Sequence, residues 1–214
     1  MAAPAGPTNP GRDCPLCPRL VAYRTDLRAK SPDWHNAPVE TFGDLPTARL
    51  LVVGLAPGVS GANRTGRPFT GDFAGTILYN ALISHGLARG TFDARPDDGL
   101  ALHNTAITNA VRCVPPQNKP VAAEVNACRP FLARTIAAMP NLSVILALGR
   151  LAHDAVLRTL GERLAAHPFA HGALHTIGGH TLADSFHTSR YNVNTNVLTP
   201  KMFDAVIAAL KTRL

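Results

Sequence analysis

The sequence contains no run of about 18 apolar residues, so no segment can cross a bilayer as a helix. The apolar stretch of a secretory signal is also absent, and we expect residues 1–13, rich in Ala, Pro and Gly, to be a flexible tail. Acidic residues are scarce, with 14 Asp and Glu against 21 Lys and Arg, a net charge of +7. This excess favours binding to a polyanion such as nucleic acid or an anionic membrane surface. The alternative is that the charge serves only to keep the protein soluble.

Cysteine is also rare, and the four cysteines form two pairs, Cys14-x2-Cys17 and Cys113-x14-Cys128. Without an export signal we expect the reducing cytoplasm, where thiols bind metal more often than they form disulfides. Four thiolates suit either zinc or an iron–sulfur cluster, and the spacing does not separate the two. Either metal would tie the N-terminal arm to the core, and two disulfides remain the alternative.

Apolar residues make up 46% of the chain, and their pattern alternates between short runs and helical spacing. Buried parallel strands are predicted at 49–54, 105–111 and 143–149, with a fourth, short strand at the end of 167–184. Helices are predicted at 14–28, 73–85, 121–139, 150–160 and 200–214. We therefore predict an α/β protein, a three-layer α/β/α domain at 14–214 around a mainly parallel four-stranded sheet.

The glycine-rich segment 54–75 is the most conspicuous loop. Long loops inside compact domains usually carry function. This loop lacks the Gly-Lys-Ser/Thr ending of a phosphate-binding loop, and no Gly-x-Gly-x-x-Gly follows the strand. Phe69 and Asp72 instead suggest a pocket for a flat ring, although Asp72 is also a good cap for the next helix. Because ligands bind beyond the carboxyl ends of parallel strands, Asn109 and the loop at His187 should face the same edge.

Several histidines follow the third predicted helix: His167, His171, His175 and His180. Their number suggests a metal site. Their spacing crosses glycine turns, however, and no carboxylate completes a ligand set, so we interpret them as structural.

Four ordered motifs resemble those of the uracil-DNA glycosylase superfamily. They are GLAPG at 54–58, NRTGRPFTGD at 63–72, TNAVRCVPPQN at 108–118 and HTSRYN at 187–192. The cysteine pattern is similar to that of the branches that hold a [4Fe–4S] cluster. Apolar Leu55 together with Asp72 resembles family 5, the B-type enzymes. The resemblance runs from about residue 14 to residue 199.

The resemblance implies an enzyme that hydrolytically excises uracil from DNA and leaves an abasic site. Hypoxanthine and modified pyrimidines are implied as further substrates. The base must be flipped into a pocket, because its reacting bond is unreachable inside a duplex. The pocket would be lined by Gly54, Leu55 and Ala56, and the implied structural cluster would be held by Cys14, Cys17, Cys113 and Cys128.

The resemblance also implies roles for individual residues. Phe69 would stack on the flipped base, and the carboxamide of Asn109 would read its edge. Asp72 would stabilise the positive sugar or orient the attacking water, and His187 would sit beside the departing base. DNA contacts are implied for Arg64, Arg67 and Ser189 at phosphates, and for Arg190 and Tyr191 as a wedge in the minor groove.

We expect a monomer that binds lesion-bearing double-stranded or single-stranded DNA. Two other classes of protein fit some of the same residues. One is a non-catalytic binder of damaged or single-stranded DNA that uses the same pocket, and free-base release distinguishes it from an enzyme. The other is a zinc-stapled nucleotide hydrolase, which would be colourless where an iron–sulfur protein is brown.

Overall fold

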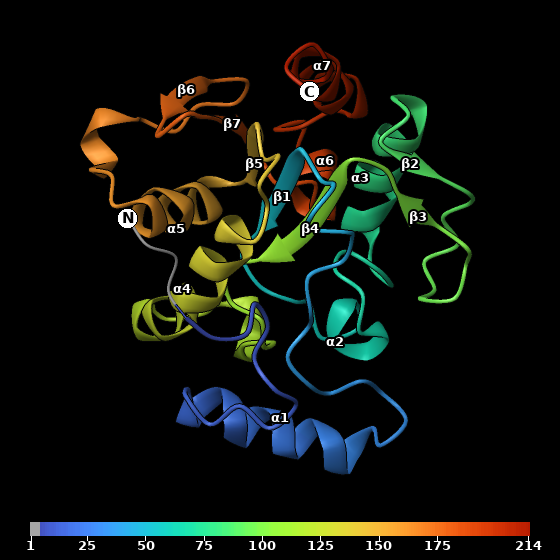
Figure 1. Ribbon diagram of the computed structural model, residues 1–214. Helices are drawn as coiled ribbons and strands as arrows, with labels where there is room; N and C mark the ends of the chain where they lie inside the picture. Colours follow the sequence, from blue (N-terminus) through green and yellow to red (C-terminus); the bar gives the residue numbers. More distant parts are fainter. Residues whose placement is uncertain (1–4) are drawn as a thin grey trace.

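The computed structural model describes residues 5–214, and a five-stranded sheet lies at its centre (Figure 1). The strand order is β4-β1-β5-β7-β6. Its parallel strands are β4 (Thr105–Asn109), β1 (Leu50–Gly54), β5 (Val144–Leu148) and β7 (His180–Ser185). Every residue of β4, β1 and β5 is buried, as continuous apolar runs predict for strands covered on both faces.

The sheet has five strands where the sequence predicted four. The additional strand, β6 (Leu174–Ile177), pairs antiparallel with β7 at the edge of the sheet. Its burial changes from exposed Leu174 to buried Ile177 along the strand, so it has no continuous apolar run to signal a strand. A separate ribbon joins β2 (Ala88–Arg89) to β3 (Ala101–Leu102).

Helices cover both faces of the sheet, which confirms the predicted three-layer arrangement (Figure 1). On the face that carries Leu50 and Val52 lie α3 (Phe73–Ser84) and α7 (Pro200–Lys211). On the face that carries Leu51 and Val53 lie α4 (Ala122–Ala137) and α5 (Arg150–Leu160). Successive β1 side chains enter different cores because strand side chains alternate between faces.

The remaining helices lie outside the two layers that cover the sheet. The first helix, α1 (Pro18–Lys30), lies apart from the sheet at the bottom of Figure 1. The loops after β1 and β7 contain α2 (Ala62–Thr65) and α6 (Arg190–Asn194), and 3-10 turns occur at Pro116–Asn118 and Leu164–Ala166. Within residues 5–214 no helix combines the length and the apolar character that a membrane crossing requires.

The N-terminal segment differs from the expected flexible tail. Over residues 5–13 it lies against the domain, and residues 1–4 fall outside the described part of the chain. The side-chain oxygen of Asn9 accepts hydrogen bonds from the Thr41 amide at 3.0 Å and from Arg112 Nη1 at 2.8 Å. Arg134 Nε donates to the Pro7 carbonyl at 2.6 Å. The physical reason is the fully buried Arg112, whose guanidinium needs acceptors that the arm supplies.

Candidate active site and metal centre

A cleft of about 610 Å³ opens at the carboxyl ends of the central parallel strands. Gly54 ends β1 and Asn109 ends β4, and the two residues are register partners. The loops after β1 and β7 contribute the other walls. The cleft is lined by most of the residues predicted to bind or attack a base: Leu55, Ala56, Phe69, Asp72, Asn109 and His187.

Gly54 contributes space rather than a contact. A Cβ atom there would lie 2.6 Å from Phe69 Cζ and would also collide with the side-chain oxygen of Asn109. Only a residue without a side chain lets both groups occupy their positions.

Phe69 is held at the cleft by an unusual backbone conformation. Its φ of 53° lies in the left-handed region, which is rare for a bulky residue and is often found at functional sites. The Tyr79 hydroxyl donates a 2.6 Å hydrogen bond to the Pro68 carbonyl and fixes the preceding peptide. The Phe69 ring lies 6.0 Å from the His187 ring, centroid to centroid. An aromatic face is therefore presented beside the histidine.

Asp72 occupies the N-cap position of α3, where its carboxylate lies near the Ala74 and Gly75 amides without forming a capping hydrogen bond of good geometry. Its Oδ1 atom is buried and has no hydrogen-bond partner within residues 5–214. Burial raises the pKa of Asp72, and the amides of Gly75 and Ala74 oppose that rise. Capping alone therefore does not account for this carboxylate, which remains available to a ligand in the cleft.

Asn109 and His187 complete the polar wall. Asn109 is buried, and no hydrogen bond within the described chain engages its carboxamide. Desolvation lowers the pKa of His187 to about 4, so its imidazole is neutral at physiological pH. Asn192 Nδ2 donates to the His187 carbonyl at 2.8 Å, and Ser189 Oγ accepts from the Asn192 amide at 3.3 Å. The Ser and Asn of the fourth motif therefore order the loop that carries the histidine.

These shifts predict the pH profile of any reaction in the cleft. We expect the ionised Asp72 carboxylate to be the reactive form, so activity should fall as pH drops through its raised pKa. His187 should not titrate between about pH 5 and 8, where an ordinary histidine would. The measurement is kcat against pH for the wild type and for His187→Gln. An acid limb that persists in His187→Gln supports the assignment, and one that disappears there contradicts it.

Among the residues predicted to contact DNA, Ser189 and Arg190 line the cleft, and Arg64 and Tyr191 are exposed. Arg190 lies over the Phe73 ring, 5.2 Å from the guanidinium carbon to the centroid, and Tyr191 is 74% exposed. Arg64 is exposed, and its Nε donates to the Ser60 carbonyl at 2.8 Å. Ser189 lines the cleft. Their positions are compatible with a strand crossing the cleft mouth, and their DNA contacts remain predictions.

Arg67 is a correction to the predicted DNA contacts. Its side chain is 6% exposed, and both terminal nitrogens donate to the buried Asp98 carboxylate, at 2.8 and 2.7 Å. The bidentate guanidinium holds the pKa of Asp98 well below its usual range. The rings of Phe42, Tyr79 and Phe92 surround the Arg67 guanidinium. The prediction was wrong because a partner 31 residues away cannot be seen in the local motif.

The sequence analysis assigned no role to some other residues that line the cleft: Gly58, Gly71, Phe73 and Asn118. Asn118 and the preceding Gln117 both have a φ of 57°, a left-handed conformation that brings the motif at 108–118 to the cleft mouth. Asn118 belongs to the motif at 108–118, and that membership could have identified it as a cleft residue from the sequence.

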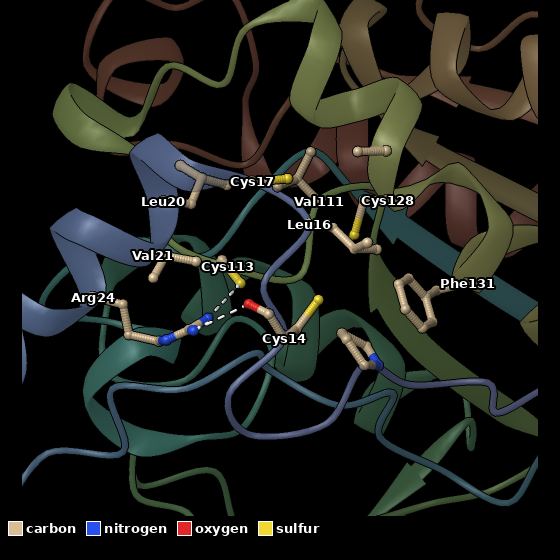
Figure 2. A pocket seen from close by; sticks show the side chains of 12 residues that line it. Cys14, Leu16, Cys17, Leu20, Val21, Arg24, Val111, Cys113, Cys128 and Phe131 are labelled. Carbon is tan, nitrogen blue, oxygen red and sulfur yellow. Dashed lines mark hydrogen bonds between the residues drawn. The ribbon is translucent and has the colours of Figure 1, made fainter.

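The four cysteines converge from separate elements in Figure 2. Cys14 and Cys17 precede α1, Cys113 follows β4 and Cys128 belongs to α4. All four are free thiols, so the alternative of two disulfides does not hold. The thiols are surrounded by apolar side chains, among them Leu16, Leu20 and Phe131.

Burial makes these thiols hard to ionise without a cation. It raises the pKa of Cys17 to about 11 and that of Cys113 to about 12, with neighbouring thiols adding to both rises. Two N–H groups point at the sulfurs: Arg24 Nη1 lies 3.6 Å from Cys113 Sγ, and the Arg112 amide lies 3.4 Å from Cys128 Sγ. Donors of this kind stabilise thiolates that bind metal.

The distances between the sulfurs indicate whether the four thiols suit a single zinc ion or a larger metal group. Within the described residues, which include all four cysteines, no three sulfurs lie within 4.8 Å of one another. Sulfurs around one tetrahedral zinc would be about 3.8 Å apart, from a Zn–S bond of about 2.3 Å. The thiols therefore suit a group larger than a single ion.

The fold and the cleft define an α/β protein that binds its ligand at the carboxyl edge of a parallel sheet. Residues 40–211 match the family described as the uracil DNA glycosylase superfamily. The chain is 45% identical over 205 residues to a type-5 uracil-DNA glycosylase of Thermus thermophilus, covering 92% of each protein. It is 42% identical to the type-5 enzyme of Pyrobaculum aerophilum, covering 91% of this chain and 86% of that one. It is 39% identical to that of Mycobacterium bovis, covering 92% and 77%.

The chain therefore belongs to the uracil-DNA glycosylase superfamily. The three relatives are all named type 5, which confirms the family predicted from Leu55 and Asp72.

Proposed function

We propose that this protein is a monofunctional DNA glycosylase that flips uracil out of DNA and hydrolyses its N-glycosyl bond. The observation that carries the proposal is the single cleft that contains Phe69, Asp72, Asn109 and His187. The names and extensive similarity of the relatives support the same activity.

Base recognition uses two walls of the cleft. The Phe69 ring stacks on the flipped base and replaces the stacking that the base loses on leaving the duplex. Asn109 offers both a donor and an acceptor, which suits the neighbouring carbonyl and N–H groups of uracil. Leu55 and Ala56 add apolar contacts at the floor. The cleft volume of about 610 Å³ also leaves room for hypoxanthine and modified pyrimidines, which we include as substrates.

Bond cleavage places negative charge on the base and positive charge on the sugar. The neutral His187 ring donates a hydrogen bond toward the base oxygen without losing a proton. The Asp72 carboxylate stabilises the sugar cation and orients the attacking water. A buried carboxylate without hydrogen-bond partners on Oδ1 is well suited to this task because little competes for its charge.

The cysteine centre fits a [4Fe–4S] cluster better than zinc, given four free thiols whose sulfurs are spaced too widely for one ion. Such a cluster would supply structural cross-linking when bound. Cys14 and Cys17 anchor the arm, and Cys113 and Cys128 anchor β4 and α4. Cys113 follows Asn109 closely along the chain, so the centre also braces the base-reading strand.

The exposed Tyr191 is the proposed wedge that fills the gap left by the flipped nucleotide. Tyr191→Ala should lower uracil excision from duplex DNA by about tenfold, since base–aromatic stacking contributes about 1–3 kcal/mol. Excision from single-stranded DNA should stay near the wild-type rate, because no gap needs filling there. Tyr191→Phe is the matched control and should keep both rates. Equal losses on both substrates would contradict the wedge.

The proposed activity is tested with a panel of single-lesion oligonucleotides. Uracil opposite guanine, uracil opposite adenine and hypoxanthine opposite thymine are incubated with purified protein, and free base and abasic sites are measured. We expect release of free uracil with stoichiometric abasic sites. Tight binding of the uracil oligonucleotide without base release would favour the non-catalytic DNA binder instead.

A further inference from the structure

A second cluster of metal-binding groups lies away from the cleft and the cysteine centre. Asp184, fully buried on β7, contacts His153 Nδ1 of α5 at 2.7 Å and His175 Nε2 of β6 at 3.1 Å. The sequence analysis found no carboxylate beside these histidines, and on this point the structure corrects it, because Asp184 lies beside His175 and His153. The carboxylate comes from the next strand, where the β6–β7 hairpin brings it back beside His175.

The hydrogen bond at His153 Nε2 determines whether Nδ1 of the neutral ring carries a proton. His153 Nε2 lies 2.8 Å from the His167 carbonyl, which can only accept a hydrogen bond, so Nε2 carries a proton. In a neutral ring Nδ1 then presents a lone pair to the Asp184 carboxylate. Two acceptors 2.7 Å apart require a cation between or beside them, either a further proton or a metal ion.

The donor set and its dimensions match a zinc-type site. Zinc takes nitrogen from histidine and oxygen from aspartate, and a ligating histidine usually donates its other N–H to a carbonyl or carboxylate, as His153 does. The three ligand atoms lie within 4.8 Å of one another. Ligand atoms about 2.0–2.1 Å from a tetrahedral zinc are roughly 3.3 Å apart, so the contacts of 2.7 and 3.1 Å would need to lengthen by about 0.6 and 0.2 Å.

The cluster also has a route to solvent. His175 is 12% exposed, whereas His153 and Asp184 are buried. An ion can reach the ligands past the partly exposed His175 ring, where a water molecule can complete the coordination.

We propose that His153 Nδ1, His175 Nε2 and the Asp184 carboxylate form a second metal site, selective for Zn²⁺ and similar divalent transition metals. Binding displaces the protons that the two rings share with Asp184. The ion would join α5, β6 and β7 directly before the loop that carries His187. This proposal does not depend on the glycosylase activity.

Zinc binding to the cluster-loaded protein tests the site, because the four cysteines are then occupied. Isothermal titration with Zn²⁺ should give a stoichiometry of about one for the wild type and an affinity at least tenfold weaker for His175→Ala. The matched control is His180→Ala on the same hairpin, where His180 Nδ1 contacts the Leu142 carbonyl and not Asp184. His180→Ala should bind like the wild type. No zinc binding by the wild type, or equal binding by His175→Ala, would overturn the proposal in favour of a shared proton.

A measurement on the wild type alone covers the case in which His175→Ala does not fold. Co²⁺ added to the cluster-loaded protein should give ligand-field bands of a nitrogen and oxygen site without thiolate charge transfer. Thiolate charge transfer alone, or no spectral change, would overturn the assignment.

Discussion

Asp72→Asn should reduce uracil excision by about 10²–10⁴-fold, the usual loss when a positioned acid–base group is removed. The substitution keeps the shape of the side chain but removes the charge that stabilises the sugar cation. KM for uracil-containing DNA should change little, because the base-binding contacts of Phe69 and Asn109 remain. The measurement is single-turnover release of uracil at neutral pH.

The same substitution should stabilise the fold, which separates a catalytic role from a structural one. Burial raises the pKa of Asp72, so the ionised carboxylate is unfavourable in the folded state above that pKa. The neutral amide that Asp72→Asn introduces avoids this cost, and we expect a gain of about 1 kcal/mol, or about 2–4 °C in Tm. The gain should be present at neutral pH and vanish as pH falls through the folded pKa, where Asp72 itself becomes neutral.

Asp97→Asn is the matched control for both measurements, because Asp97 is exposed. It should leave excision and Tm near wild-type values. An Asp72→Asn protein with wild-type excision would remove Asp72 from the mechanism. One with a lowered Tm would show that the carboxylate caps α3.

Disruption of the cysteine centre should cause the second-largest effect, a loss of iron and of thermal stability. Cys113→Ser should lose the iron and the visible absorption, since Cys113 is one of the four proposed ligands. The arm and α1 would lose their attachment to β4 and α4, leaving the small apolar contact around Leu20 and Phe131. Loss of a native cross-link costs about 2–5 kcal/mol, which corresponds to a Tm lower by about 4–20 °C for a domain of this size.

Leu16→Ala is a suitable control for the cysteine substitution. Leu16 lies between Cys14 and Cys17 and lines the same pocket, but it is 53% exposed and offers no ligand. It should retain iron, colour and a Tm close to the wild type. A Cys113→Ser protein with wild-type iron content and Tm would contradict the proposed ligand set. If the purified wild type is colourless and contains zinc, the cysteines bind a single zinc ion and the proposed [4Fe–4S] cluster is wrong.

The parts of the fold that could be predicted are those fixed by local sequence. Strands β1, β4 and β5 are continuous apolar runs, and a buried parallel strand needs little else. Strand β6 could not be predicted because half of its side chains face solvent and its pairing depends on β7. The cleft residues that act through side chains were predicted from motifs, yet their convergence depends on the parallel register of Gly54 and Asn109.

The errors share a physical origin in partners distant along the chain. Arg67 was predicted at DNA from its place in a motif, whereas Asp98 and three aromatic rings hold it inside the fold. The N-terminal arm was predicted to be flexible from its composition, whereas Asn9 is bound by the buried Arg112. The partner of a buried charge is determined by the tertiary structure, so it cannot be read from composition or from a local motif.

The proposed mechanism depends on Phe69, Asp72, Asn109 and His187 forming a pocket for one flipped base. The sharpest experiment is fluorescence of a purine analogue placed next to uracil in a duplex, because the analogue brightens when its neighbour leaves the stack. Bound to Asp72→Asn, which should cleave the substrate only slowly, the duplex should brighten before uracil is released. The additional change Phe69→Ala should abolish the brightening. Equal brightening with and without the Phe69 ring, or none with either protein, would contradict a base-flipping pocket at this site.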